Sequence, residues 1–153
     1  MSEENKAVVR RLYNEVFNRT EMGVIDEIYA PDAELHLPGF PEDPFGPAPV
    51  HQLAAMICTA FPGIQSTIED LIDQGDKVVA RATFHRAHES KLLGIGPQSR
   101  LTTWTRIDIF RLFQGRIVEH WADRDDAGLL QQLGVVPPPL ITRGQVPARD
   151  YSH

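Results

Sequence analysis

Four stretches of strand-like alternation follow one another in the second half of the chain, and tight turns lie at two of the three junctions between them. Gly75-Asp76 lies between residues 64–72 and 77–88, and Gln114-Gly115 lies between residues 100–113 and 116–123. A turn of two residues joins antiparallel neighbours, because it cannot carry the chain back to begin a parallel strand. The sequence therefore predicts consecutive antiparallel strands.

The first half of the chain has mostly helical periodicity. Apolar residues recur at three- and four-residue spacing in residues 3–18, 22–29 and 50–61, and residues 32–37 alternate like a short strand. Helices followed by consecutive strands indicate an α+β fold with the helices on one face of the sheet. Residues 38–49 hold five prolines, which is typical of a rigid loop, and we expect this loop to form the rim of a pocket.

The chain of 153 residues fits one domain. We expect that domain to cover residues 1–136 and to end with a short helix at 126–133. A polar, proline-rich C-terminal tail is expected at 137–153.

Charge and composition exclude several classes of partner. A net charge of −6 without a Lys/Arg cluster argues against nucleic acid. The chain has no basic amphipathic helix for a membrane surface and no apolar run of about 18 residues that could span a membrane. A single cysteine and a polar N-terminus without a signal peptide predict a cytoplasmic protein.

The sequence predicts neither a nucleotide cofactor nor a metal. Residues 94–97 read GIGP, and no Gly-Lys-Ser/Thr follows them, so they are not a phosphate loop. His85, His88 and Glu89 have a spacing that suits a metal site on a helix. In the strand expected here, residues three apart point to opposite faces, so we reject this site.

Three stretches of the sequence resemble a known family. They read VRRLYNEVFN at 9–18 with IYAPDA at 28–33, DIFR at 108–111 with GRIVEHW at 115–121, and DDAGLLQQLG at 125–134. They resemble the SnoaL-like polyketide cyclases of the NTF2-like, or ketosteroid-isomerase-like, superfamily. The resemblance implies a cone in which N-terminal helices pack against a curved, mainly antiparallel sheet. It also implies a cofactor-free pocket for a small, largely apolar organic substrate, and a homodimer or a dimer of dimers.

The resemblance implies a catalytic acid/base shortly after the tryptophan of the last strand. Asp125, four residues after Trp121, matches this position best, and a carboxylate at the mouth of an apolar cone suits proton exchange. Asp123 and Asp126 are close enough to be alternatives. Asp125 could instead only cap the following helix.

Four further residues are candidates for the pocket. We expect His36, at the end of a strand, to act catalytically as the donor to an enolate oxygen. Trp121 would form an aromatic wall, and Phe40 of the proline-rich loop is expected to contact substrate. Alternation places His120 on the face opposite Trp121, so a solvated or structural histidine is favoured over its substrate-binding alternative.

Arg106 and Asp108 share one face of the strand predicted at residues 100–113. The other face carries Ile107 and Ile109, which suit the core better, so the outward orientation is favoured for Arg106. Asp108 belongs to the DIFR stretch and keeps a possible role in substrate binding.

Two classes of function remain open from the sequence. An aspartate near the end of the last strand favours an enzyme over a non-catalytic small-molecule-binding module. The run from Glu119-His120-Trp121 to Gly134 favours a cyclase that closes rings by acid/base, aldol-type chemistry on a polyketide-like ketone or ester. The alternatives are other enzymes on the same scaffold, namely an isomerase, a cofactor-free hydroxylase or an epoxide hydrolase.

Overall fold

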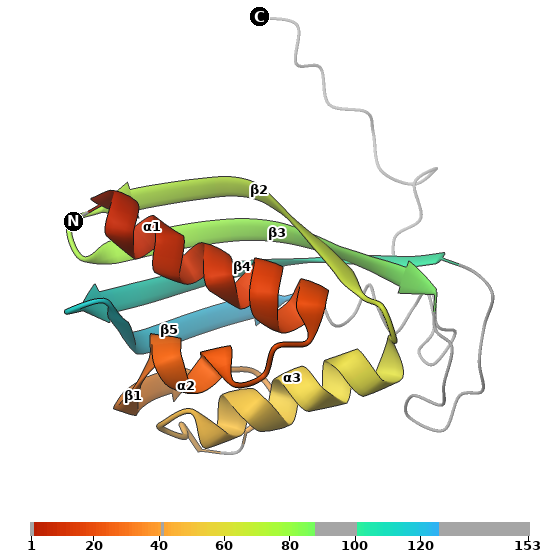
Figure 1. Cartoon of the computed structure of the whole chain (residues 1–153), viewed down its shortest axis with the longest axis horizontal. Coiled ribbons are helices and arrows are strands. Elements are labelled where there is room, and N and C mark those ends of the chain that lie inside the picture. The colour runs from red at the N-terminus through yellow and green to blue at the C-terminus, as the bar shows by residue number, and fades with distance from the viewer. Residues whose placement is uncertain (1, 41, 88–100, 126–153) are drawn as a thin grey trace, which may run out of the picture.

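The computed structural model describes residues 2–40, 42–87 and 101–125 (Figure 1). The helix predicted at 126–133 and the tail at 137–153 therefore lie outside the described residues. The elements are, in chain order, α1 (Ser2–Arg11), a π-helical segment η1 (Leu12–Phe17), α2 (Val24–Ile28), β1 (Tyr29–His36), α3 (Ala48–Ala60), β2 (Gln65–Gln74), β3 (Lys77–Ala87), β4 (Leu101–Phe113) and β5 (Arg116–Arg124).

The five strands form one open, curved sheet in the order β1-β5-β4-β3-β2. The pairs β2/β3, β3/β4 and β4/β5 are antiparallel, and β1 lies parallel to β5 at the edge. The turns at Gly75 and Gly115 both have positive φ, as a tight reversal requires. The predicted α+β order with a mainly antiparallel sheet is confirmed.

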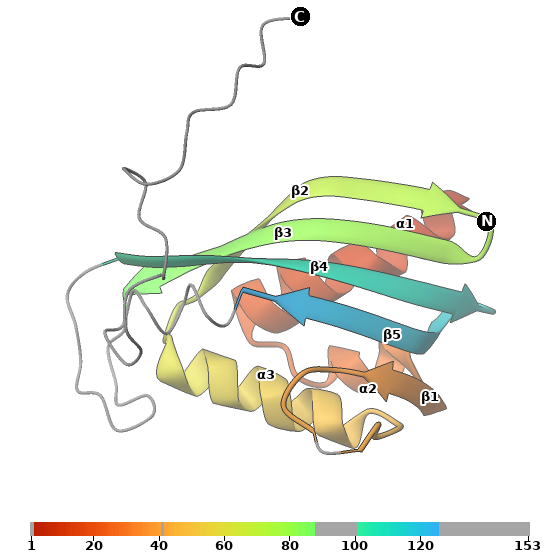
Figure 2. The same ribbon diagram turned by 180° about the vertical axis from the view of Figure 1, so that it is seen from behind.

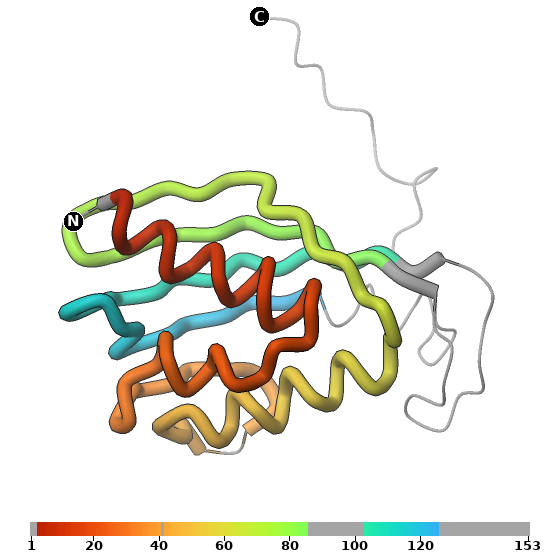
Figure 3. The backbone as a smooth tube through the Cα atoms, in the orientation of Figure 1, coloured from red at the N-terminus to blue at the C-terminus, as the bar shows by residue number. Residues whose placement is uncertain are grey.

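The helices lie on one side of this sheet. In Figure 1 they lie in front of the strands, and in Figure 2, seen from behind, the strands cover α1. The backbone trace in Figure 3 shows how β2 bends along its length toward α3, which gives the sheet its curvature. We call the side that faces the helices the inner face and the opposite side the outer face.

The predicted helix at 3–18 is one continuous helical segment, but its last part is not α-helical. From Leu12 to Phe17 the backbone has π-helical hydrogen bonding, a wider winding that adds a residue to the turn. Four of these six residues are buried: Leu12, Tyr13, Val16 and Phe17. The widened turn therefore directs the hydroxyl-bearing side chain of Tyr13 into the core together with its apolar neighbours.

A β-bulge in β5 changes which residues face the helices. The register runs Arg111 to Glu119 and then Leu112 to Ile117, so Val118 is the extra residue on β5. Ile117 and His120 are both buried although they lie three positions apart. Because side chains alternate strictly along a regular strand, only the extra residue allows both to face inward.

The core fills the space between the helices and the inner face. Its largest fully buried side chains include Tyr13, Tyr29, Phe84 and Phe110. Within residues 2–40, 42–87 and 101–125, no helix is long and apolar enough to cross a membrane.

Candidate functional site

A small cavity lies between α3 and the inner face of β4 and β5. Its volume is about 20 Å³, enough for about one water-sized group. Four of its lining residues are polar or charged, and the others are apolar. The lining consists of Tyr29, Arg106, His120 and Arg124, together with Leu12, Phe17, Leu37, Val50, Leu53, Ala54 and Ile57. The guanidinium of Arg124 donates to the carbonyl oxygen of Pro38 at 3.4 Å, so the beginning of the proline-rich loop borders this cavity.

Asp108 is the centre of a buried hydrogen-bond network behind the cavity. Its Oδ2 accepts from the Tyr13 hydroxyl at 2.9 Å and from Arg106 Nε at 2.7 Å. Its Oδ1 accepts from Arg106 Nη2 at 2.6 Å and from His120 Nε2 at 2.6 Å. The side chain is 0% exposed, and four donors saturate its two oxygens. The hydrogen-bonding capacity of Asp108 is therefore filled by contacts within the protein, which argues against the expected contact with substrate.

His120 extends this network to Tyr29. Because Nε2 faces the Asp108 carboxylate it must carry a proton, and in the neutral ring Nδ1 is then an acceptor. Nδ1 lies 2.9 Å from the hydroxyl oxygen of Tyr29, which donates to it. Both ring nitrogens are thus occupied within the protein. The structure agrees with a structural histidine, although one that is buried and not solvated.

The charges of the network follow from burial and from these contacts. Burial alone would raise the pKa of Asp108, but the positive charge of Arg106 and the hydrogen bond from His120 outweigh it and hold that pKa well below its ordinary value. Burial lowers the pKa of His120, which keeps the ring neutral beside Arg106. Burial and the Asp108 charge raise the pKa of the Tyr13 hydroxyl, and also that of Tyr29, so both stay protonated.

Arg106 is held rigidly at the cavity wall. Its Nε and Nη2 form a two-pronged bond with Asp108. The guanidinium carbon lies 6.0 Å and 5.8 Å from the ring centres of Phe17 and Phe84, within cation–π range. Burial alone would lower the pKa of Arg106, but the charge of Asp108 outweighs this and raises it, so the guanidinium is permanently charged.

The predicted outward orientation of Arg106 is wrong. Arg106 is 8% exposed, whereas Ile107 and Ile109 are 48% and 36% exposed on the outer face. Apolar character alone favoured the isoleucines for the core. A charged pair can be buried instead when each member satisfies the hydrogen bonds of the other, as Arg106 and Asp108 do.

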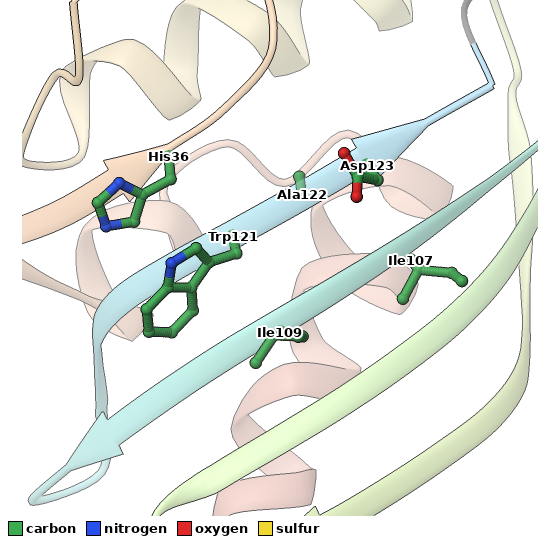
Figure 4. A pocket seen from close by; sticks show the side chains of 6 residues that line it. All are labelled: His36, Ile107, Ile109, Trp121, Ala122 and Asp123. Atoms are coloured by element: carbon green, nitrogen blue, oxygen red, sulfur yellow. The ribbon is translucent and has the colours of Figure 1, made fainter.

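A second pocket lies on the outer face and contains two of the predicted site residues. It has a volume of about 230 Å³ and is lined by His36, Ile107, Ile109, Trp121, Ala122 and Asp123 (Figure 4). The rings of His36 and Trp121 are stacked at 5.3 Å, and Lys77 Nζ lies 6.0 Å from the centre of the Trp121 ring. His36 and Trp121 therefore lie together at this outer-face pocket and not at the inner cavity that Arg106 lines, and their expected roles toward substrate stay predictions.

An ionic cluster surrounds His36 on this outer face. Its Nε2 lies 2.8 Å from Glu119 and its Nδ1 lies 2.7 Å from Asp43. The hydrogen bonds to Glu119, and then to Asp43, raise the pKa of His36. Glu34 completes a group in which the potential metal-ligand atoms of Glu34, His36 and Glu119 lie within 4.8 Å of one another.

The sequence did not predict this cluster, because the parallel pairing of β1 with β5 brings its members together. Glu119 also accepts from Arg111 at 3.0 Å. Ion pairs within the protein thus already engage two of the three potential ligands, His36 and Glu119. The other histidine pattern of the sequence reaches His88 and Glu89, which lie outside the described residues.

The remaining predicted residues lie at the ends of the site. Asp125 is exposed directly after β5, and its backbone N–H donates to the carbonyl oxygen of Thr105 at 3.1 Å. Asp123 is exposed on the outer face, and Asp126 lies outside the described residues. Phe40 is half-buried and packs against the core. The catalytic role of Asp125 and the substrate contact of Phe40 stay predictions.

Sequence reasoning missed Tyr13 and Tyr29 as members of the site. Each follows directly after an apolar residue of a buried helical face, Leu12 and Ile28 respectively. A hydroxyl on such a face needs a buried partner. That requirement is the signal that would have predicted polar groups on the inner face of the sheet.

One protein family matches most of the chain. The family described as SnoaL-like polyketide cyclase matches residues 7–133. The comparison with curated proteins returns no significant match.

Among solved structures, IdmH from Streptomyces antibioticus, a proposed polyketide cyclase, is 32% identical. The match covers 86% of this chain and 99% of IdmH, with a TM-score of 0.76. AclR from Streptomyces galilaeus, a proposed hydroxylase, is 23% identical over 94% of this chain and 92% of its own, with a TM-score of 0.82. A hypothetical protein with a ketosteroid-isomerase-like fold from Catenulispora acidiphila is 13% identical over 84% of this chain and 93% of its own, with a TM-score of 0.68. The last two support the fold alone, and the predicted NTF2-like fold is confirmed.

Proposed function

Because the chain belongs to the SnoaL-like polyketide cyclase family, we propose that it is a cofactor-independent cyclase that closes a ring in a polyketide-like ketone or ester by acid/base, aldol-type chemistry. One observation carries this proposal: a charged, desolvated network borders an otherwise apolar cavity beside the strand end that bears Asp125. Fixed charges in a water-excluded site stabilise the charge that develops when a C–H bond ionises. The similarity to IdmH supports the proposed reaction class.

We assign the proton transfers to Asp125. It directly follows Arg124, whose side chain lines the cavity, and its backbone is held by Thr105. The carboxylate takes a proton from the carbon next to a carbonyl, and the electron pair of that C–H bond moves onto the carbonyl oxygen as an enolate. The enolate carbon attacks a second carbonyl of the same molecule and forms the new C–C bond. The resulting alkoxide then takes the proton back from Asp125.

The hydrogen bonds of the Asp108 network indicate that the catalytic base lies outside that network. Asp108 has no acceptor site left, and His120 has both ring nitrogens engaged. A further proton on His120 would place two buried positive charges side by side, because Arg106 shares the same carboxylate oxygen. The network therefore contributes fixed charges to the site, and the proton transfers are left to a group outside it.

The test uses heptane-2,6-dione, an apolar diketone that can close a six-membered ring on itself. In deuterated buffer, exchange at the carbons next to its carbonyls reports proton removal, and the ring product reports the whole reaction; NMR follows both. We expect the wild-type protein to accelerate both processes. Asp125→Asn should lose about 10²- to 10⁴-fold in rate, the usual contribution of a general base.

Asp123→Asn is the matched control, because it removes a carboxylate two residues away on the outer face. It should keep the wild-type rate. Full activity in Asp125→Asn would contradict the assignment of the base, and a wild-type protein that accelerates neither process would contradict the proposed function. Thermal melts of both variants separate catalysis from helix capping, since a cap would lower stability together with activity.

A further inference from the structure

Arg106 has one nitrogen left over after its bonds to the protein. Asp108 engages Nε and Nη2, which form one edge of the guanidinium. Among the residues that the structure describes, the third nitrogen, Nη1, has no hydrogen-bond partner. Arg106 lines the inner cavity, and because Nε and Nη2 are engaged by Asp108, Nη1 is the nitrogen best able to donate a hydrogen bond to a ligand there.

From this geometry we infer that Arg106 binds the enolate oxygen of the substrate through Nη1, and that Asp108 positions the guanidinium for this contact. The inference rests on the proposed cyclase function and names the group that stabilises its intermediate. The substrate class is then a ketone or ester whose reacting carbonyl oxygen becomes an oxyanion inside the cavity.

Two other polar groups of the cavity lining, His120 and Tyr29, cannot take this role. His120 donates its single N–H to Asp108, and Tyr29 donates its hydroxyl proton to His120. Neither has a proton left to offer an oxyanion. Arg106 keeps its Nη1 protons and a charge that does not titrate at working pH.

The size and rigidity of the site fit an oxygen atom. The cavity of about 20 Å³ has room for about one water-sized group, such as a single oxygen atom. Phe17 and Phe84 lie against the guanidinium, and the two-pronged bond to Asp108 fixes its plane. A donor fixed before the reaction stabilises a developing oxyanion without reorganisation.

Pentane-2,4-dione is the probe, because its enolate absorbs in the near ultraviolet and can be distinguished from its neutral forms. Excess wild-type protein should raise the enolate absorbance at a fixed pH at which buffer alone leaves the diketone largely neutral, with the released proton taken up by the buffer. Arg106→Gln should bind the enolate roughly 10- to 100-fold more weakly, the loss expected for one charge-assisted hydrogen bond. Arg111→Gln is the matched control and should keep wild-type binding. Arg111 lies on β4 like Arg106, but on the outer face, where it pairs with Glu119 of β5.

A carboxylate offers the same oxyanion chemistry, so a second arm tests it. Butyrate should displace the enolate, and butyramide should not. If butyrate binds through Arg106 while the diketone stays un-ionised, the site recognises a substrate carboxylate and the enolate assignment is overturned.

A folding control keeps the test decisive. Arg106→Gln leaves the Asp108 carboxylate without its partner, so the double variant Arg106→Gln/Asp108→Asn, which buries no single charge, is measured beside it. Wild-type enolate binding in either folded variant overturns the inference. Ring closure of heptane-2,6-dione without any enolate signal overturns the inference alone, whereas an Arg106-dependent enolate signal without ring closure overturns only the cyclase function.

Discussion

Replacing Asp108 by asparagine tests whether the buried network holds the fold together. Asparagine has nearly the same shape but lacks the negative charge, and one of the two acceptor oxygens becomes a donor NH₂ group. In the native protein those oxygens accept four hydrogen bonds, from Tyr13, His120 and twice from Arg106. The variant therefore loses two of these bonds and leaves the Arg106 guanidinium without its counter-ion.

Two estimates of the cost agree. Hydrogen bonds to charged groups contribute about 1.5–3 kcal/mol each, which gives roughly 3–6 kcal/mol for the two that are lost. Removing one partner of a buried ion pair costs about 3–5 kcal/mol. For a domain of this size, 3–5 kcal/mol corresponds to a fall in melting temperature of roughly 6–20 °C.

Urea unfolding followed by circular dichroism measures this loss in Asp108→Asn. The matched control is Asp70→Asn, because Asp70 also pairs with an arginine, Arg81 Nε at 2.6 Å, but both side chains are about half exposed. The control should change the free energy of unfolding by less than about 1 kcal/mol. The double variant with Arg106→Gln should recover part of the loss.

A loss below about 1 kcal/mol in Asp108→Asn, or strictly additive effects in the double variant, would refute the ion-pair reasoning. The pH dependence gives an independent check. Because the folded-state pKa of Asp108 is depressed, its stabilisation is fully present above the unfolded-state pKa of about 3.9. It is lost as the pH falls through the folded-state value.

Two further predictions concern the outer face. The hydrogen bonds to Glu119 and Asp43 raise the pKa of His36. The stability that protonated His36 contributes is therefore present below the unfolded-state pKa of about 6.5 and is lost as the pH rises through the higher folded-state pKa. An NMR titration should show that Glu119→Gln lowers the pKa of His36, and an unchanged pKa would contradict the ion pair. The two-fold dimer expected from the sequence stays a prediction. Light scattering should give twice the chain mass for the wild-type protein, and a wild-type monomer would contradict the dimer. Ile107→Glu, which places a charge on the exposed outer face, should give a monomer.

The order of the elements could be predicted from the sequence because it depends on local patterns. Periodicity and the turns at Gly75 and Gly115 placed the helices and strands that the structure describes to within a few residues. The position of β1 could not be predicted in this way. It pairs in parallel with the last strand, β5, across more than 80 residues of chain, as in the contact of His36 with Glu119.

The orientation of the site residues was harder to predict than the elements that carry them. Strict alternation from Ile117 would place Trp121 on the inner face, but the extra residue Val118 reverses the alternation and places His120 there instead. On β4, both faces contain apolar residues, so hydrophobicity could not identify the buried one. The decision depends on whether Arg106 finds a buried partner, which is a property of two residues and of the contacts that tertiary structure gives them.

Because all hydrogen-bonding positions of Asp108 and His120 are filled, we expect different residues to determine stability and proton transfer in this site. Asp108 and His120 have all their hydrogen-bonding capacity engaged, so their loss should act first on the free energy of unfolding and on activity only through Arg106. Asp125 lies outside the network and is exposed, so its loss should act on proton transfer with little change in stability. Thermal melts and deuterium exchange on Asp108→Asn and Asp125→Asn should therefore respond in opposite proportion. If both variants lost stability and deuterium exchange to the same extent, the expected division between structural residues and the proton-transferring residue would be contradicted.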